Sequence, residues 1–274
     1  MIREVTGLYF SPSGETAKIT KKITREVAAR LNEICIGEIG FSFVDFLRDK
    51  ADHDRDFNDE SVVVIGMPVY SGRIPEPCTD ILKKMKGRGT LAIVIVSYGN
   101  NSYGDSLYEL YTRAEESGFC VISAGAFISQ HAIFKKVAEE RPDAFDLEKI
   151  IEFSGISANK VKRLAGTEIS AMRAKPAPLD IKGSMPTKKP VRVPIHPTAN
   201  SFCIKCGDCA KICPMGAIDA ADPKKVDFKK CISCTACITV CEQDARGFYG
   251  PLSAASRIAL EKLFSKRKDP EWFI

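Results

Sequence analysis

The sequence has few features that would place the protein in a membrane, in a secretory pathway or on nucleic acid. None of its 274 residues belongs to a run of 18 or more uncharged apolar residues, so no membrane-spanning helix is predicted. Residues 1–10 contain Arg3, Glu4 and only a short apolar run, too short for a signal-peptide core. The net charge is only +5, which gives little support to nucleic-acid binding. We expect a cytoplasmic protein.

Glycine motifs for nucleotides are also missing. Neither G-x-G-x-x-G nor G-x-x-x-x-G-K-[ST] occurs, which removes the usual fingerprints of dinucleotides and nucleoside triphosphates. Cysteine, in contrast, is abundant, with eleven residues, and eight of them fall between Cys203 and Cys241. A disulfide framework is not expected beside a large first domain without a secretion signal, so these thiols point to metal.

Short, β-branched apolar runs alternate with segments of helical length through the first 165 residues. The predicted strands are 4–10, 61–66, 90–97 and 119–127, with a weaker one at 34–39. Amphipathic patterns predict helices over 14–31, 103–117 and 144–164. This alternation predicts a parallel sheet with right-handed crossovers, and therefore a doubly wound α/β domain over residues 1–165.

Three further segments follow this domain. Residues 166–197 are rich in proline and lysine and predict an extended linker. Residues 198–250 hold the clustered cysteines, and 251–274 predict a helix from Ser253 to Phe264 with an apolar tail. We expect Trp272 and its neighbours in the tail to dock against the protein rather than against a partner.

Two cysteine runs carry the strongest chemical signal. Cys203, Cys206, Cys209 and Cys213 have the spacing C-x2-C-x2-C-x3-C and are followed by Pro214. The same cysteine spacing recurs 28 positions later as Cys231, Cys234, Cys237 and Cys241, where Glu242 takes the place of the proline. Three closely spaced thiolates and one distant thiolate suit a 4Fe-4S cluster. Zinc needs only four ligands, usually as two separated pairs, so the repeated runs favour two iron–sulfur clusters.

Residues 198–250 resemble bacterial two-cluster ferredoxins. In that family the fourth cysteine of each run ligates the other cluster. The resemblance therefore implies that the first cluster is held by Cys203, Cys206, Cys209 and Cys241. It implies that the second cluster is held by Cys213, Cys231, Cys234 and Cys237. Outside these runs, Cys78 precedes a predicted helix and would be reactive if it were exposed at that helix start.

The loop after the first predicted strand reads Ser11-Pro12-Ser13-Gly14-Glu15-Thr16. Backbone N–H groups, hydroxyls and the positive end of the following helix can hold a monophosphate there. The same residues also form an ordinary helix N-cap, so the loop alone leaves both interpretations open.

The segments YFSPSGET, GMPVYSGRIP and SYGNNSYGD follow the first, third and fourth predicted strands. They resemble the three flavin-contacting loops of the flavodoxin family, and the whole chain resembles a family of flavodoxin–ferredoxin fusion flavoproteins. The resemblance implies a flavodoxin-like doubly wound parallel sheet in strand order 2-1-3-4-5, with FMN at the carboxyl edge of the strands. It also implies a small C-terminal α+β two-cluster ferredoxin domain.

The same resemblance implies roles for individual residues. The phosphate would be bound by Ser11, Ser13, Gly14, Glu15 and Thr16. The first ring-contacting loop would comprise Pro68, Val69, Tyr70, Ser71, Gly72 and Arg73. The second would comprise Ser97, Tyr98, Gly99, Asn100 and Tyr103. Related fusions often carry an arginine after the Gly-Asn pair; here Asn101 takes its place, and Arg73 is the candidate to compensate.

His131 follows the last predicted strand at the same edge of the sheet. Because imidazole titrates near neutrality, we hypothesise that it handles a proton during flavin reduction, with a structural role as the alternative.

The sequence thus predicts an FMN- and iron–sulfur-dependent oxidoreductase that moves electrons between two 4Fe-4S clusters and FMN. Its partner would be a ferredoxin-like donor or acceptor protein, and a homodimer is an open possibility. A pure electron carrier without a small-molecule substrate is one alternative. A flavin-free docking module fused to a ferredoxin is another.

Overall fold

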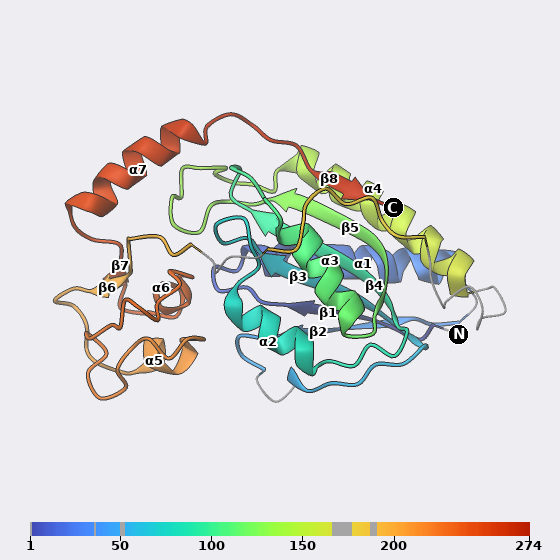
Figure 1. Cartoon of the computed structure of the whole chain (residues 1–274), viewed down its shortest axis with the longest axis horizontal. Coiled ribbons are helices and arrows are strands. Elements are labelled where there is room, and N and C mark those ends of the chain that lie inside the picture. The colour runs from blue at the N-terminus through green and yellow to red at the C-terminus, as the bar shows by residue number, and fades with distance from the viewer. Residues whose placement is uncertain (1, 36, 50–52, 166–176, 187–190) are drawn as a thin grey trace.

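The computed structural model describes residues 2–35, 37–49, 53–165, 177–186 and 191–274. Its first part alternates strands and helices (Figure 1) in the order β1 (Glu4–Tyr9), α1 (Glu15–Ile34), β2 (Gly40–Asp45), β3 (Ser61–Pro68), α2 (Glu76–Lys84), β4 (Leu91–Tyr98), α3 (Ser106–Glu116), β5 (Cys120–Ile128) and α4 (Ala144–Ala165). The second part contains β6 (Thr198–Ala199), α5 (Asp208–Ile212), α6 (Ala236–Thr239), β7 (Arg246–Gly247), α7 (Pro251–Leu263) and β8 (Glu271–Phe273).

The main sheet has the strand order β2-β1-β3-β4-β5-β8. Strands β1 to β5 are parallel, which confirms the predicted order 2-1-3-4-5, and β8 adds an antiparallel strand to the β5 edge. Because β1 lies between β2 and β3, the winding direction reverses there. The loops after β1 and β3 therefore diverge at a switch point, where open α/β sheets bind their ligands.

The weak strand predicted at 34–39 is wrong, because the second strand is Gly40–Asp45. The preceding helix continues to Ile34, and the side chain of Asn32 then holds the turn. Its amide donates to the carbonyl of Ile39 (2.9 Å) and accepts the N–H of the same residue (2.7 Å). β2 is a half-exposed edge strand, so its apolar signal is weaker than that of the buried strands.

Helices cover both faces of the sheet. α1 and α4 pack on one face, where Ile19, Ile23 and Phe153 are fully buried. α2 and α3 pack on the other face, where the core includes Leu82 and Leu110. The central strands β3, β4 and β5 are apolar and buried almost throughout, as expected for a parallel sheet covered on both sides.

Part of the predicted linker packs against the first domain. Residues 166–176 and 187–190 lie outside the described part of the chain, while 177–186 and 191–197 contain no helix or strand. Leu179 and Ile181 are buried in the same core cluster as residues of α2 and α3. The cysteine-rich unit beyond has only a small core of its own, around Cys209, Ile218 and Cys237. Its folding therefore needs support from metal or from neighbouring segments.

The C-terminal tail returns to the first domain, as expected. After α7 the chain crosses back and pairs β8 with β5 (Figure 1), with Trp272 opposite Gly125. The indole ring lies 6.3 Å from the ring of Phe153. No helix in the described residues is long and apolar enough to cross a membrane.

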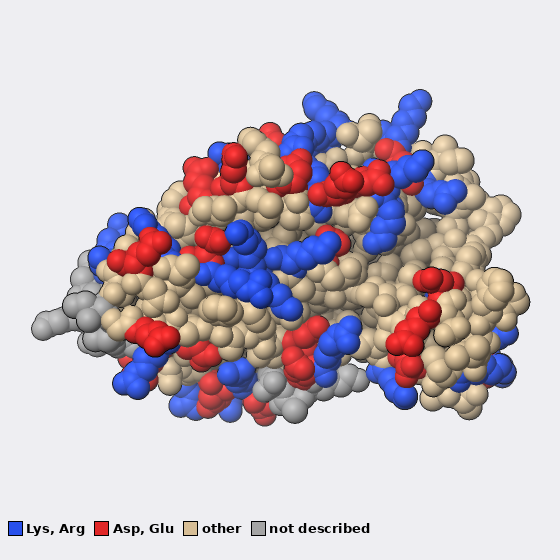
Figure 2. Space-filling view, turned by 180° about the vertical axis from the view of Figure 1, so that it is seen from behind, with Lys and Arg blue, Asp and Glu red and all other residues tan. Residues whose placement is uncertain are grey.

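Charges of both signs are interspersed on the face shown in Figure 2. Along α1, Lys22 pairs with Glu26 (2.7 Å) and Arg30 with Glu33 (2.6 Å). Lys21 and Arg25 instead lie over the ring of Phe43 on the edge strand β2, at 5.4 and 5.2 Å. These cations cover the exposed aromatic edge of the sheet.

Candidate cofactor sites

A cleft of about 970 Å³ opens at the carboxyl ends of the parallel strands. The loops after β1, β3 and β4 all line it, as the sequence predicts. Of the proposed flavin contacts, the structure brings these residues to the cleft: Ser13, Glu15, Thr16, Pro68, Val69, Tyr70, Ser71, Ser97, Tyr98 and Gly99.

The loop before α1 is shaped to receive an anion. Gly14 has φ 89°, and an added Cβ there would meet no atom within 4 Å, so this tight bend leaves open space in front of the helix. The hydroxyl of Ser11 accepts the N–H of Ala17 (2.8 Å), which caps the helix. The hydroxyls of Thr16 and Ser97 bond to each other at 2.6 Å and tie this loop to the end of β4.

Unsatisfied polar groups at this loop test whether a phosphorylated ligand fits. The N–H groups of Glu15 and Thr16, at the start of α1, donate no hydrogen bond to any residue that the structure describes. Such helix-start donors bind phosphate. Oε2 of Glu15 is buried without a hydrogen-bond partner, while Oε1 pairs with Lys18 at 2.8 Å. A ligand carrying both a phosphate and hydroxyl groups would satisfy these atoms.

The loop after β3 is a tight turn. The N–H of Tyr70 donates to the carbonyl of Arg73 (2.8 Å), and the N–H of Arg73 donates to the carbonyl of Tyr70 (3.1 Å). Ser71 and Gly72 between them have φ 51° and 77°, the left-handed pair that such a turn requires. Gly72 therefore serves the turn and faces Gly104 rather than the cleft.

His131 packs directly over Gly99 at the cleft. An added Cβ on Gly99 would lie 2.5 Å from Cδ2 of His131, so only glycine permits this contact. Nδ1 of His131 accepts the N–H groups of Ile133 (3.1 Å) and Phe134 (3.2 Å). Burial, with a smaller effect from Lys135, lowers the pKa of His131 to about 4. The ring is therefore neutral near pH 7 and carries its proton on Nε2.

Three predicted ring contacts have other partners in the structure. Arg73 forms two 2.7 Å hydrogen bonds with the fully buried carboxylate of Glu109, which also meets Arg113 at 3.1 Å. Burial favours a higher pKa for Glu109, but these two cations outweigh it and hold the pKa below its usual value. Arg73 thus neutralises a buried acid, and its charge is not available to replace the missing arginine at position 101.

Asn100 and Tyr103 contact the C-terminal tail. The Asn100 amide donates to the carbonyls of Phe264 (2.7 Å) and Lys266 (2.9 Å). The hydroxyl of Tyr103 donates to Glu271 (2.8 Å). The resemblance assigns both side chains to flavin. In the structure their hydrogen bonds go to the C-terminal tail, which they anchor to the first domain.

Other residues at the cleft carry no signal in the sequence. Ser129, Gln130 and Ile133 reach it from the end of β5, where only His131 had been singled out. Arg192 and Val193 reach it from the segment predicted to be an extended linker. The guanidinium of Arg192 contacts Glu76 of α2 (3.1 Å) and the carbonyl of Lys229. Position alone could have suggested the β5 residues, because every parallel strand ends at this edge.

The eight clustered cysteines fall into two groups. Cys213, Cys231, Cys234 and Cys237 line one cavity of about 360 Å³, and Cys203, Cys206, Cys209 and Cys241 line another of about 350 Å³. These are the crossed sets that the ferredoxin resemblance implies. Within the described residues, no three His, Cys, Asp or Glu side chains converge on a single metal ion. Four thiols around a cavity suit a cluster better than one ion.

The two cysteine loops share the same backbone geometry. Lys205 and Ser233, which are 28 positions apart, have φ 60° and 52°, and Gly207 and Thr235 have φ 87° and 72°. The second loop thus keeps the left-handed bends without glycine, which costs conformational energy. Backbone N–H groups also reach two sulfurs, from Ala217 to Cys213 (3.3 Å) and from Ser233 to Cys231 (3.4 Å). Such bonds tune cluster potentials.

The hypothesis of a reactive Cys78 is wrong. Cys78 lies in the first turn of α2 but points into the core and is fully buried. Burial raises the pKa of its thiol well above the ordinary value, so the thiolate that reacts is not formed near pH 7.

The second cysteine group meets the cleft. The hydroxyl of Tyr70 donates to the carbonyl of Cys234 at 3.4 Å, and Ile232 lines the cleft itself. Cys234 and Ala236 are part of the same buried core as α2 and α3. The cavity of the first group, which Cys206 lines, shares no lining residue with the cleft, and Cys206 is exposed.

Comparisons with known proteins agree with this arrangement in part. The first domain is a flavodoxin-like α/β fold by its strand order. Residues 187–246 match the family described as the 4Fe-4S dicluster domain. The chain thus joins a doubly wound α/β domain of flavodoxin-like strand order to a segment that matches the 4Fe-4S dicluster family. No curated protein matches the chain.

Several solved flavodoxins are similar to the first part of the chain. A flavodoxin from the domain Archaea is 16% identical with a TM-score of 0.42, and the match covers 59% of this chain and 99% of that one. Flavodoxin 1 from Bacillus cereus is 17% identical with a TM-score of 0.40, covering 57% and 97%. A short-chain flavodoxin associated with a non-canonical PDU bacterial microcompartment is 18% identical with a TM-score of 0.40, covering 61% and 100%.

Proposed function

We propose that the chain binds FMN in the cleft and two 4Fe-4S clusters in the C-terminal unit, and that it passes electrons between them. The observation that carries this proposal is the contact between Tyr70, which lines the cleft, and Cys234, which lines the second cluster cavity. FMN is proposed from the flavodoxin-like fold and from the unsatisfied donors and acceptor at the start of α1.

Each cofactor would be held by its own set of residues. The phosphate would lie on the N–H groups of Glu15 and Thr16 with the hydroxyls of Ser13 and Thr16. A ribityl hydroxyl would donate to the unpartnered Oε2 of Glu15. The ring would lie between the two loops that carry Tyr70 and Tyr98, and the Nε2–H of His131 would face the same cleft. Flavin accepts one or two electrons and so links single-electron carriers to two-electron chemistry.

The positions of the two cysteine groups suggest an order for the electrons. The second cluster, held by Cys213, Cys231, Cys234 and Cys237, would be next to the flavin because it adjoins Tyr70 and Ile232. The first cluster would exchange electrons with an external ferredoxin-like protein, because Cys206 is exposed to solvent. The neutral His131 would act as a hydrogen-bond donor to the ring rather than as an acid near pH 7.

Cofactor content and single-turnover kinetics test this function. Protein purified without oxygen should contain one FMN and about eight irons per chain. A reduced bacterial ferredoxin should then bleach the iron–sulfur band before the flavin band. Chains with zinc in place of iron, or flavin that stays oxidised while the clusters are reduced, would overturn the proposal. Turnover with quinones or nitroaromatics would distinguish an oxidoreductase from a pure carrier.

A further inference from the structure

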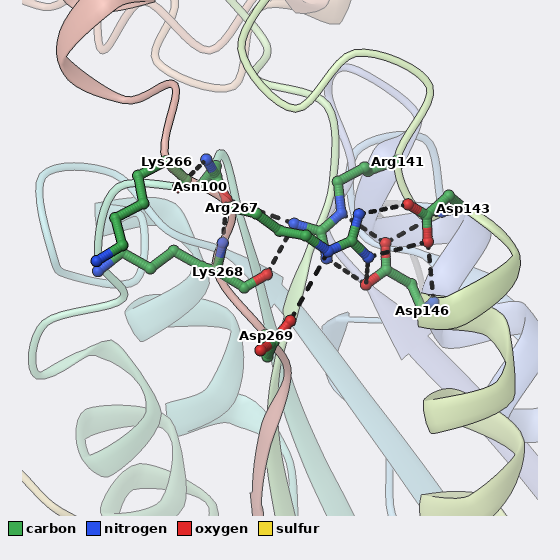
Figure 3. Close-up of polar contacts among 8 residues, drawn as sticks. All are labelled: Asn100, Arg141, Asp143, Asp146, Lys266, Arg267, Lys268 and Asp269. Carbon is green, nitrogen blue, oxygen red and sulfur yellow. Dashed lines mark hydrogen bonds and ion pairs between the residues drawn. The ribbon is translucent and has the colours of Figure 1, made fainter.

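The C-terminal residues 264–273, which we call the clasp, are fastened to the first domain by one fully satisfied amide. Asn100 donates through Nδ2 to the carbonyls of Phe264 (2.7 Å) and Lys266 (2.9 Å). Its Oδ1 accepts the N–H of Lys268 (3.0 Å) and a guanidinium N–H of Arg141 (3.4 Å). Figure 3 shows this amide between the clasp and Arg141. Both donors and both lone pairs of the side chain are used.

Charged groups fix the same stretch of the clasp. Arg141 is buried against Asp146, and its Nη1 donates to the carbonyl of Lys268 (2.9 Å). From the clasp, Arg267 pairs with Asp143 (2.7 Å) and lies 3.6 Å from Asp146 (Figure 3). Arg141 and Asp146 are buried and already paired, and the clasp adds the Lys268 carbonyl and the half-exposed Arg267 to this pair, so the network favours one position of the clasp.

The end of the clasp is held by the sheet. β8 pairs with β5, and Glu271 accepts a hydrogen bond from Tyr103 (2.8 Å). Trp272 packs beside Phe153, and Lys149 lies 5.8 Å from the indole ring. The clasp is therefore an integral edge of the first domain, although in the sequence it follows the cysteine-rich unit.

The start of the clasp belongs to an apolar cluster at the mouth of the cleft. This junction cluster consists of Ile133, Phe134, Val137, Val193, Ile195, Phe248, Leu260 and Phe264. Its members come from the loop after β5, the linker, the end of the cysteine-rich unit, and α7 with the clasp. Ile133 and Val193 also line the cleft. Fixing Phe264 therefore fixes the segments that cover the cofactor position.

The cysteine-rich unit is thus tethered at both ends. Its N-terminal tether is the linker, whose Leu179 and Ile181 are buried in the first domain. Its C-terminal tether is α7, of which no residue is buried, followed by the clasp. Cys234 and Ala236 pack into the core of the first domain, but the exposed helix by itself would not hold the C-terminal side of the unit, so on that side the anchoring falls to the clasp and the junction cluster.

We propose that the clasp holds the cluster-bearing unit over the cleft, and that Asn100 and Arg267 are positioning residues for electron transfer between the second cluster and the flavin. This inference rests on the proposed function, because it assigns a role in that electron transfer. The physical reason is that electron transfer weakens steeply with the distance between cofactors. A unit attached by one tether samples many distances, whereas two anchors hold one.

Two variants and a matched control test the clasp. Arg267→Ala removes the pairs with Asp143 and Asp146, and a chain ending at Leu263 removes the whole clasp. Lys266→Ala removes an equal charge one residue away, whose side chain points away from the ion pairs in Figure 3. Iron and FMN content should remain close to those of the unaltered protein in all three.

Hydrogen exchange provides a readout that does not depend on flavin. The amides of His131, Ile133, Phe134 and Val137 donate hydrogen bonds within the loop that contacts Phe264. In Arg267→Ala and in the shortened chain, amides of residues 131–137 should exchange about tenfold faster or more. Flavin reduction through the clusters should slow about tenfold or more in the same proteins. Lys266→Ala should change neither. Unchanged exchange and unchanged flavin reduction in the Arg267→Ala protein would overturn the inference, even if the shortened chain fails to fold.

The exchange result separates this inference from the proposed function. If the unaltered protein binds no flavin, the proposed function fails, but faster exchange at 131–137 in the variants would still show that the clasp holds the junction cluster in place. If flavin binds and is reduced equally fast with and without Arg267, the proposed function survives and the clasp has no role in it.

Discussion

The hydroxyl of Tyr70 donates a hydrogen bond to the carbonyl oxygen of Cys234 across 3.4 Å. This contact joins residues that are 164 positions apart in the chain. Tyr70 belongs to the loop after β3 and lines the cleft, while Cys234 lines the cavity of the second cysteine group. One side chain therefore lines the cleft and contacts a residue of the second cysteine group.

Replacing Tyr70 should affect electron transfer more than cofactor content. Tyr70→Phe keeps the ring and loses only a long hydrogen bond, so we expect a loss of about 1 kcal/mol in the free energy of unfolding. Tyr70→Ala leaves a cavity between the two sites and should cost about 3–5 kcal/mol. Stopped-flow absorbance would measure flavin reduction through the clusters, which should be slower in Tyr70→Ala. Equal rates in the two variants would contradict this role.

Thr16→Val should weaken FMN binding but not riboflavin binding. The hydroxyl of Thr16 lies at the proposed phosphate position and bonds to Ser97 (2.6 Å). A hydrogen bond to a charged group contributes about 1.5–3 kcal/mol, so FMN affinity should fall roughly tenfold or more. Fluorescence titration of the flavin-free protein would measure both ligands. Thr24→Val, on the same helix but away from the cleft, is the control and should change neither affinity.

His131 should make the stability of the flavin-free protein depend on pH. Its pKa falls from 6.5 in the unfolded chain to about 4 in the folded protein. The unfolded state therefore binds the proton first, so stability is complete above pH 6.5 and is lost as pH falls toward 4. Between about pH 7.5 and 5.5 the loss should be about 1 kcal/mol.

Urea unfolding of the His131→Gln protein at both pH values would check the assignment. The variant cannot titrate at this position, so its stability should fall less between the two pH values than that of the unaltered protein. An identical decrease in both proteins would show that another group causes the pH dependence.

Arg73→Ala should destabilise the fold while leaving flavin affinity intact. Arg73 pairs with Glu109, whose side chain is completely buried, and Arg113 is the second partner of that carboxylate. Loss of one partner from a buried pair costs about 3–5 kcal/mol, and the remaining Arg113 should reduce the loss to about 2–3 kcal/mol.

Thermal unfolding of Arg73→Ala is best compared with that of Arg88→Ala. Arg88 pairs with Asp56 at the exposed surface, where such pairs contribute no more than about 1 kcal/mol. A weaker FMN affinity in a correctly folded Arg73→Ala protein would show that Arg73 contributes to FMN binding.

Local patterns in the sequence predicted the strands β1, β3, β4 and β5 and the three cleft loops, because buried parallel strands are continuous apolar runs. The second strand was misplaced, because β2 is a half-exposed edge strand whose position depends on the turn held by Asn32. The cysteine spacing indicated two four-thiol groups. Their crossed pairing came from the family resemblance, and the structure shows it as two separate cavities.

The sequence by itself determined the class of fold, the two runs of four cysteines and the loops that meet at the cleft, since each depends on residues close together in the chain. Only the tertiary structure decided that Arg73 pairs with Glu109, that Asn100 binds residues 264–268, and that Arg192 and Val193 cover the cleft. A polar side chain bonds to whichever group the fold brings within reach, and a group more than a hundred positions away leaves no local pattern to indicate it.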